Sequence, residues 1–108
     1  MGKANPRAVA LAKDFKARAA AKYRIRRIIL FGSQATGRWR PDSDIDLLVV
    51  ADRPGSKPAF MSDLLREWHV VQEKSAPVDF VCVTPREFKI RAKRVTLVQQ
   101  ALERGVAV

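Results

Sequence analysis

The 108-residue sequence is poor in cysteine, in acidic side chains and in long apolar runs. A single cysteine excludes a disulfide within the chain, and Cys82 lies in an apolar run where a buried, reduced thiol is expected. Charge interrupts the N-terminal segment repeatedly, which fits neither a signal peptide nor a membrane span. We therefore expect a cytoplasmic protein that makes no contact with a membrane.

The shortage of acidic residues leaves 11 Asp and Glu against 21 Lys and Arg, a formal net charge of +10. Such an excess favours polyanionic partners, which include nucleotides, nucleic acid and acidic protein surfaces. The basic residues are spread over segments 13–27, 38–53 and 86–104, so solvated helix faces explain them at least as well. Charge alone does not choose between these interpretations.

The fold class follows from length and apolar pattern. With 47% hydrophobic residues, the chain can form one compact domain, which we place at residues 1–108. The pattern predicts the order helix, strand, short helix, strand, helix, strand, helix. These elements are expected at residues 6–23, 28–31, 33–37, 44–50, 59–74, 78–83 and 85–104. Three apolar strands flanked by helices indicate an α/β sandwich.

Helix ends and core faces follow from local residue chemistry. Asn5 is expected to cap the first helix, and Thr84 with Glu87 to form a capping box before the last. Gly37 and Gly105 are expected to end helices. The helical positions expected to face the core are Ala8, Leu11, Phe15, Ala19, Met61, Leu64, Leu65, Trp68, Val71, Phe88, Ala92, Val95, Val98 and Leu102. A second apolar row on the last helix fits a partner contact or extra core packing equally well, and comprises Ile90, Leu97 and Ala101.

Two carboxylates, Asp44 and Asp46, stand one residue apart at the start of an otherwise apolar strand. Alternate strand residues point to the same face, so the two charges repel unless a cation or an arginine intervenes. Arg38 and Arg40 are the nearby arginines. Taken alone, the pair fits a polar strand end slightly better than a metal site.

Further features shift this balance. Asp79 is a lone carboxylate in the third apolar strand, where a charge is costly without a positive partner. Gly32 and Ser33 directly follow the first strand, and Ser33 is expected to cap a helical turn whose free amides can hold phosphate oxygens. A simple helix cap is the plainer explanation of that turn. Placed together, Asp44, Asp46 and Asp79 would suit two Mg²⁺ ions, so the combination favours a nucleotide-and-metal site.

Gly32-Ser33, ten intervening residues and Asp44-Ile45-Asp46, with Asp79 on a later strand, closely resemble the minimal nucleotidyltransferase domains of the DNA polymerase β-like superfamily. The resemblance covers nearly the whole chain and implies the minimal nucleotidyltransferase fold, with a three-stranded mixed sheet flanked by helices. It implies that the three aspartates form the metal site and that Asp79 helps to activate the acceptor hydroxyl. It also implies that Gly32 and Ser33 contact the nucleotide phosphates.

The reaction implied by this resemblance transfers AMP from ATP to a hydroxyl, with two Mg²⁺ ions, or Mn²⁺ in their place. Relatives often read Gly-Ser-Arg-Ala-Arg-Gly, whereas Gln34 and Thr36 stand here at the arginine positions. Arg38, or Arg40, is expected to supply the phosphate contact instead. No histidine base is required, so we expect His69 to be a surface or packing residue.

The sequence alone does not determine which molecule accepts the AMP group. The resemblance implies a helical HEPN-type ribonuclease toxin as partner, with the chain acting as its antitoxin by adenylylating a tyrosine. An RNA 3′ end or a small molecule is the alternative, although an aminoglycoside would need an acidic site, which this chain's charge disfavours. A third hypothesis is a binding module without catalysis, which neutralises a toxin by steric contact or binds nucleic acid.

Overall fold

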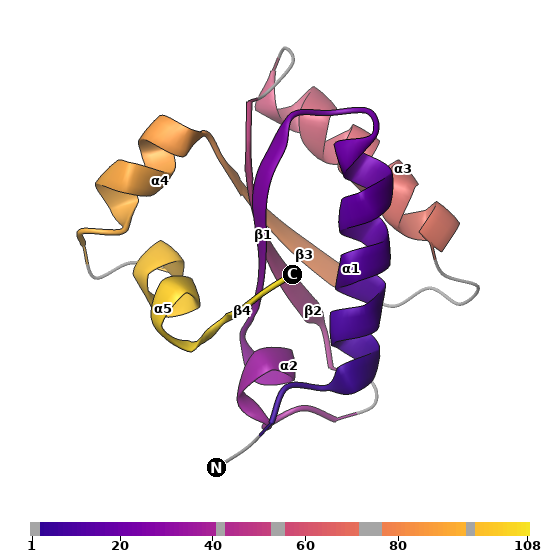
Figure 1. Cartoon of the computed structure of the whole chain (residues 1–108), viewed down its shortest axis with the longest axis vertical. Helices are drawn as coiled ribbons and strands as arrows, with labels where there is room; N and C mark the ends of the chain where they lie inside the picture. Colours follow the sequence, from indigo (N-terminus) through magenta and orange to yellow (C-terminus); the bar gives the residue numbers. More distant parts are fainter. Residues whose placement is uncertain (1–2, 41–42, 53–55, 72–76, 95–96) are drawn as a thin grey trace.

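A computed structural model of the chain describes residues 3–40, 43–52, 56–71, 77–94 and 97–108. Its elements are α1 (Pro6–Ala20), β1 (Ile25–Phe31), α2 (Ser33–Thr36), β2 (Ile45–Ala51), α3 (Lys57–Val71), β3 (Val78–Val83), α4 (Pro85–Arg91), α5 (Leu97–Arg104) and β4 (Val106–Ala107). The strands form one sheet in the order β3-β2-β1-β4. Helices α1 and α3 cover one face of this sheet, and α4 and α5 lie against the other (Figure 1). The expected α/β class is confirmed.

The sheet is mixed, because β2 runs parallel to β3 and antiparallel to β1. A parallel pair requires a long crossover, which α3 supplies. The sheet has four strands rather than the expected three, since β4 pairs antiparallel with β1 at Leu30 and Ile29. A strand of two residues is too short to leave an alternating pattern, so only its pairing with β1 defines it.

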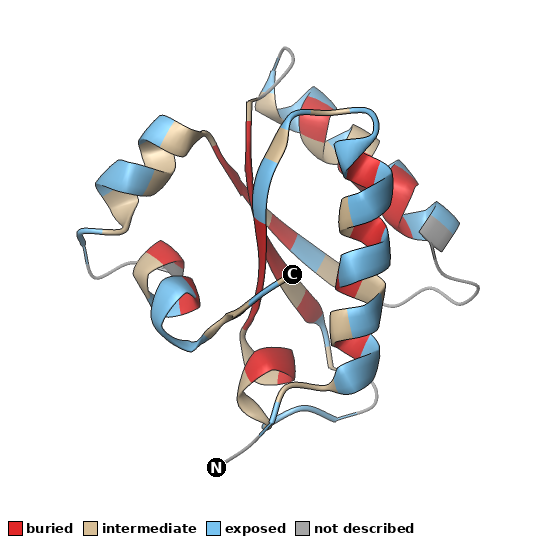
Figure 2. Cartoon of the chain, in the orientation of Figure 1, coloured by how far each residue is buried: buried red, intermediate tan, exposed pale blue. Residues whose placement is uncertain are grey.

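The larger core layer lies between the sheet and helices α1 and α3 (Figure 2). Phe15, Trp68 and Phe80 pack ring against ring there, with centroids 5.3 to 6.4 Å apart. Most of the expected core positions of α1 and α3 are buried or half-buried, but Leu65 is 38% exposed. Phe60 is fully buried instead, because the α3 stripe that faces the sheet runs through residues 60, 64 and 68. The Val71 side chain lies outside the described residues.

The second core layer packs α4 and α5 on the opposite face of the sheet. A continuous helix over 85–104 was expected, and this is wrong, because α4 ends at Arg91 and α5 begins at Leu97. With two separate helices, Val98 and Ala101 of α5 pack on the sheet. Ala101 is therefore core, whereas Leu102 is 39% exposed and Ile90 is also exposed. Val95 and the Leu97 side chain lie outside the described residues.

Most predicted helix ends are confirmed. Asn5 Oδ1 accepts from the Arg7 amide at α1, and Thr84 and Glu87 form the capping box of α4. Helix α1 ends at Ala20 rather than at residue 23, since Tyr23 turns to pack its ring 5.4 Å from that of Phe60.

Cys82 is buried, as expected. In the described segments, no helix has both the length and the apolar character needed to cross a bilayer.

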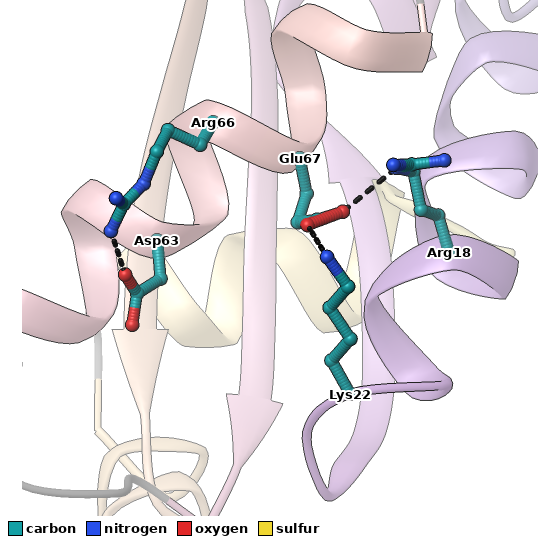
Figure 3. A network of polar contacts seen from close by, with 5 residues as sticks. All are labelled: Arg18, Lys22, Asp63, Arg66 and Glu67. Carbon is teal, nitrogen blue, oxygen red and sulfur yellow. Dashed lines mark hydrogen bonds and ion pairs between the residues drawn. The ribbon is translucent and has the colours of Figure 1, made fainter.

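A buried carboxylate joins α1 to α3 (Figure 3). Glu67 on α3 accepts hydrogen bonds from Lys22 Nζ at 2.6 Å and from Arg18 Nε at 2.8 Å. The hydrogen bond from Lys22 is the largest cause of a lowered pKa for Glu67, and the positive charges of both partners lower it further, while burial opposes them. A second pair, Asp63 with Arg66, lies within α3 itself. Glu67 therefore fixes the helical layer on the face away from α5.

Candidate active site

The strand register brings together two carboxylates that lie far apart in the sequence. Asp46 of β2 and Asp79 of β3 are direct neighbours in the parallel pair, and adjacent strands lie about 4.8 Å apart. The residues before and after Asp46 in β2 pack on the α1 side of the sheet. Asp46 lies on the opposite face, together with Leu48, which packs in the same cluster as the buried residues of α5. Asp79 shares this face with Val81. Both carboxylates thus lie at one end of the sheet, on the side of α5.

Asp44, the first predicted metal ligand, lies just before β2 and is exposed. The pKa of Asp46 is raised, chiefly by burial, and then by the negative charges of Asp79 and Asp44. Asp79 and Asp44 are therefore both close enough to act on Asp46 electrostatically. In the described segments, no three acidic, histidine or cysteine side chains already converge as a ligand set. Carboxylate oxygens are nevertheless the donors that Mg²⁺ prefers, and a divalent cation would relieve the repulsion at Asp46.

The backbone of Gly32 lies directly beside the Asp46 carboxylate. Its φ is +72°, a left-handed value that disfavours side chains, and a Cβ there would collide with Asp46 Oδ2 and lie 3.2 Å from Asp46 Cγ. Gly32 is also the N-cap of α2, so the expectation that Ser33 caps this turn is wrong, and Ser33 is the first helical residue. Thr36 Oγ1 donates to the Gly32 carbonyl at 3.3 Å. Gly37 ends α2 in the left-handed conformation, as expected.

Gln34 is a positioning residue that the sequence did not reveal. Its side chain is 2% exposed, and its Nε2 donates to the carbonyl of Ser43 at 2.8 Å. Its Oε1 accepts from Asn5 Nδ2 at 2.9 Å, and the Asn5 amide donates to the Gln34 carbonyl. Gln34 therefore links the start of α1 to the residue that precedes Asp44. A glutamine in a short polar turn carries no signal of such distant partners.

A cavity of about 540 Å³ opens beside the carboxylates, within the size range of small-molecule sites. It is lined by Phe31, Gly32, Thr36, Asp46, Asp79, Phe80, Val81, Gln100 and Arg104. Of the predicted site residues, Gly32, Asp46 and Asp79 thus share one cavity. Ser33, Arg38 and Asp44 are not among its lining residues.

Residues 11–108 match the family model of the nucleotidyltransferase domain. The chain belongs to this family. Over 42 residues it is 50% identical to a protein of Methanocaldococcus jannaschii whose name proposes protein adenylyltransferase activity. That match covers 37% of this chain and 42% of the relative. The resemblance drawn from the Gly-Ser and Asp-x-Asp motifs is confirmed for the nucleotidyltransferase domain, while pairing with a HEPN toxin stays a prediction.

The arginines of this nucleotidyltransferase domain differ in whether they line the cavity. Arg38 and Arg40 are exposed, and the Arg40 amide donates to Ser43 Oγ. Arg104 of α5 lines the cavity instead, and it forms no ion pair with any residue in the described part of the chain. Sequence reasoning missed Arg104 because one basic residue in the last turn of a helix is ordinary. Trp39 donates its indole N–H to the Lys3 carbonyl at 3.2 Å.

Proposed function

We propose that the chain is a metal-dependent nucleotidyltransferase that moves AMP from ATP to a hydroxyl group. The observation that carries this proposal is the pairing of Asp46 with Asp79 in one cavity, directly against the backbone of Gly32. Membership of the nucleotidyltransferase domain family gives independent support for nucleotidyl transfer.

The three aspartates have two roles in this proposal. Asp44 and Asp46 would hold two Mg²⁺ ions, or Mn²⁺, which when bound neutralise charge on the phosphate oxygens. Asp79 would accept the proton of the attacking hydroxyl, because its exposed carboxylate can reach an incoming substrate. A bond then forms between the hydroxyl oxygen and the α-phosphorus, the bond to the β-phosphate breaks, and pyrophosphate leaves.

The phosphates would lie against α2. The Gly32 backbone lines the cavity and approaches Asp46, so a nucleotide there would meet the carboxylates and the first amides of the α2 turn together. We assign phosphate contacts to Gly32 and Ser33, with Arg38 as a further contact from the loop that precedes β2.

We propose a protein hydroxyl as acceptor, namely a tyrosine of a helical HEPN-type toxin that the chain would silence as an antitoxin. The name of the Methanocaldococcus jannaschii relative, which proposes a protein as the target of adenylylation, favours this choice. Covalent AMP would add bulk and negative charge to the partner's own site. The chain's net charge of +10 keeps an RNA 3′ end as a second candidate acceptor.

The test is to incubate the chain with ATP labelled at the α-phosphate, Mg²⁺ and the candidate partner, and to follow intact mass. The proposal expects the partner to gain AMP, and expects Asp44→Asn and Asp46→Asn to abolish this gain. Asp14→Asn on the exposed surface of α1 removes the same charge away from the cavity and should leave transfer unchanged. A partner that is neutralised without gaining mass would instead establish a non-catalytic binding module.

A further inference from the structure

The end of α5 forms the wall of the cavity that faces the carboxylates. Gln100 and Arg104 line the cavity from α5, one helical turn apart, while Asp46 and Asp79 line it from the sheet. The Arg104 side chain is exposed and has no ion pair within the described segments. The cavity therefore has an anionic side and a cationic side that do not neutralise each other directly.

The position of Arg104 is fixed by the chain that follows it. The Gly105 amide donates to the Ala101 carbonyl at 2.7 Å, and Val106 then pairs with Leu30 of β1. A Cβ on Gly105 would collide with the Ala101 carbonyl oxygen and the Ile29 side chain, so only glycine allows this close turn. Arg104 is thus held beside the end of β1, where Phe31 and Gly32 enter the site.

We infer that Arg104 binds the phosphate chain of the nucleotide and supplies the cation that Gln34 and Thr36 do not provide. A metal–triphosphate complex carries positive charge toward the carboxylates and spare negative charge on its outer phosphates. Asp46 would help to hold the metal of such a complex, and Arg104, which lines the same cavity, would contact its phosphates. A guanidinium group is suited to this contact because its fork of donors matches two phosphate oxygens at once.

This role gives α5 a function besides packing. Val98 and Ala101 hold one side of the helix against the sheet, while Gln100 and Arg104 lie on the side that lines the cavity. Arg104 would stabilise the negative charge that builds up on the leaving pyrophosphate, in addition to binding ATP. The inference rests on the proposed function, because it assumes that the cavity takes a nucleotide.

The experiment is calorimetric titration of the chain with Mg²⁺ and α,β-methylene ATP, which cannot transfer AMP, and separately with Mg²⁺ and AMP. Arg104→Gln is expected to weaken binding of the triphosphate analogue by about 10- to 100-fold, the usual loss for a charge-assisted hydrogen bond. Binding of AMP should change by less than about threefold, since AMP lacks the outer phosphates. Arg104→Lys should recover part of the lost affinity because it restores the charge without the fork.

Arg94→Gln is the matched control, because Arg94 is exposed and lines a different hollow with Lys89, Ile90 and Lys93. It should leave both affinities unchanged, which separates a local contact from general attraction by net charge. Thermal unfolding of Arg104→Gln should match that of the wild type, since the side chain is exposed. Equal binding of the analogue by the wild type and Arg104→Gln would overturn the inference alone. No binding by the wild type would overturn the proposed function with it.

Discussion

Asp46 is a partly buried carboxylate that lies close to two other negative charges. Partial burial and the charges of Asp79 and Asp44 raise its pKa, so its ionised form is disfavoured in the folded protein without a cation. Its carboxylate also lies against Gly32, where no other residue would fit. A charged residue at this position lowers the stability of the fold. Such destabilising charges are typical of functional sites.

Asp46→Asn is therefore expected to raise the melting temperature by a few degrees in metal-free buffer near pH 7. Because the native pKa is raised, the ionised carboxylate lowers stability at neutral pH, and that penalty fades as the pH falls through the native value. Circular dichroism melts from pH 4 to 7 with a chelator present measure this. Mg²⁺ should stabilise the wild type but not Asp46→Asn. A variant that melts below the wild type without metal would show that Asp46 is a structural residue.

Gln34 illustrates why a family pattern cannot be transferred to every position. Relatives often carry arginine where Gln34 stands, but here the side chain is buried and bonded to Asn5 and Ser43. Gln34→Arg is expected to lower the free energy of unfolding by about 1–3 kcal/mol, because it leaves buried partners unpaired, and to weaken nucleotide binding by displacing Asp44. Urea unfolding and calorimetric titration measure these effects. A stable variant with tighter binding would mean that residue 34 reaches the phosphates.

At the scale of the elements, local pattern predicted what local forces determine. The alternation in residues 78–83 gave β3 with its correct faces, and the apolar run after Asp44 gave β2 within one residue at each end. The caps at Asn5 and Thr84 were predicted because they depend on near neighbours. The break between α4 and α5, and the strand β4, escaped prediction because packing on the far side of the sheet and pairing with β1 decide them. For the same reason, the aspartates could be named in advance, whereas Arg104 could not.

Gly105→Ala tests whether this C-terminal turn holds α5 in place. The added methyl group would meet the Ala101 carbonyl and Ile29, and overpacking of this kind costs about 1–3 kcal/mol. The free energy of unfolding, measured in urea, should fall by that amount, and nucleotide affinity should fall with it because Arg104 moves. Ala107→Gly, at an exposed position of β4, should have a smaller effect. If Gly105→Ala unfolds like the wild type, the turn does not fix α5.

The link between α1 and α3 makes a separate prediction about pH. The pKa of Glu67 is lowered, first by the hydrogen bond from Lys22, so its stabilising contribution is complete above its ordinary value of 4.5 and is lost as pH falls through the lower native value. Glu67→Gln should lower stability at pH 7. The stability of this variant should also fall less than that of the wild type as the pH is lowered. Melting curves between pH 2.5 and 7 would show this. An unchanged acid profile in the variant would mean that other carboxylates govern acid unfolding.

Considered as a whole, the molecule has chemically different ends to its sheet. At the end of β1, the carboxylates of β2 and β3 meet Gly32 and Arg104 around one cavity. At the start of β1, another hollow of about 660 Å³ is bordered by Arg26, Arg27, Asp52, Arg86 and Lys89, among others. Most of the basic side chains named here therefore lie at the other end of β1 from the carboxylates, whose cavity is lined, among the described residues, by the single cation of Arg104.

The proposed metal site is tested most directly by the number of Mn²⁺ ions that the chain binds in the presence of α,β-methylene ATP, measured by electron paramagnetic resonance. If Asp44 and Asp46 hold the metal ions of a nucleotidyltransferase site, the wild type should bind about two ions per chain with the nucleotide. Asp46→Asn should lose this binding, and Asp14→Asn should retain it. Equal uptake of Mn²⁺ by the wild type and Asp46→Asn would show that Asp46 does not bind the metal.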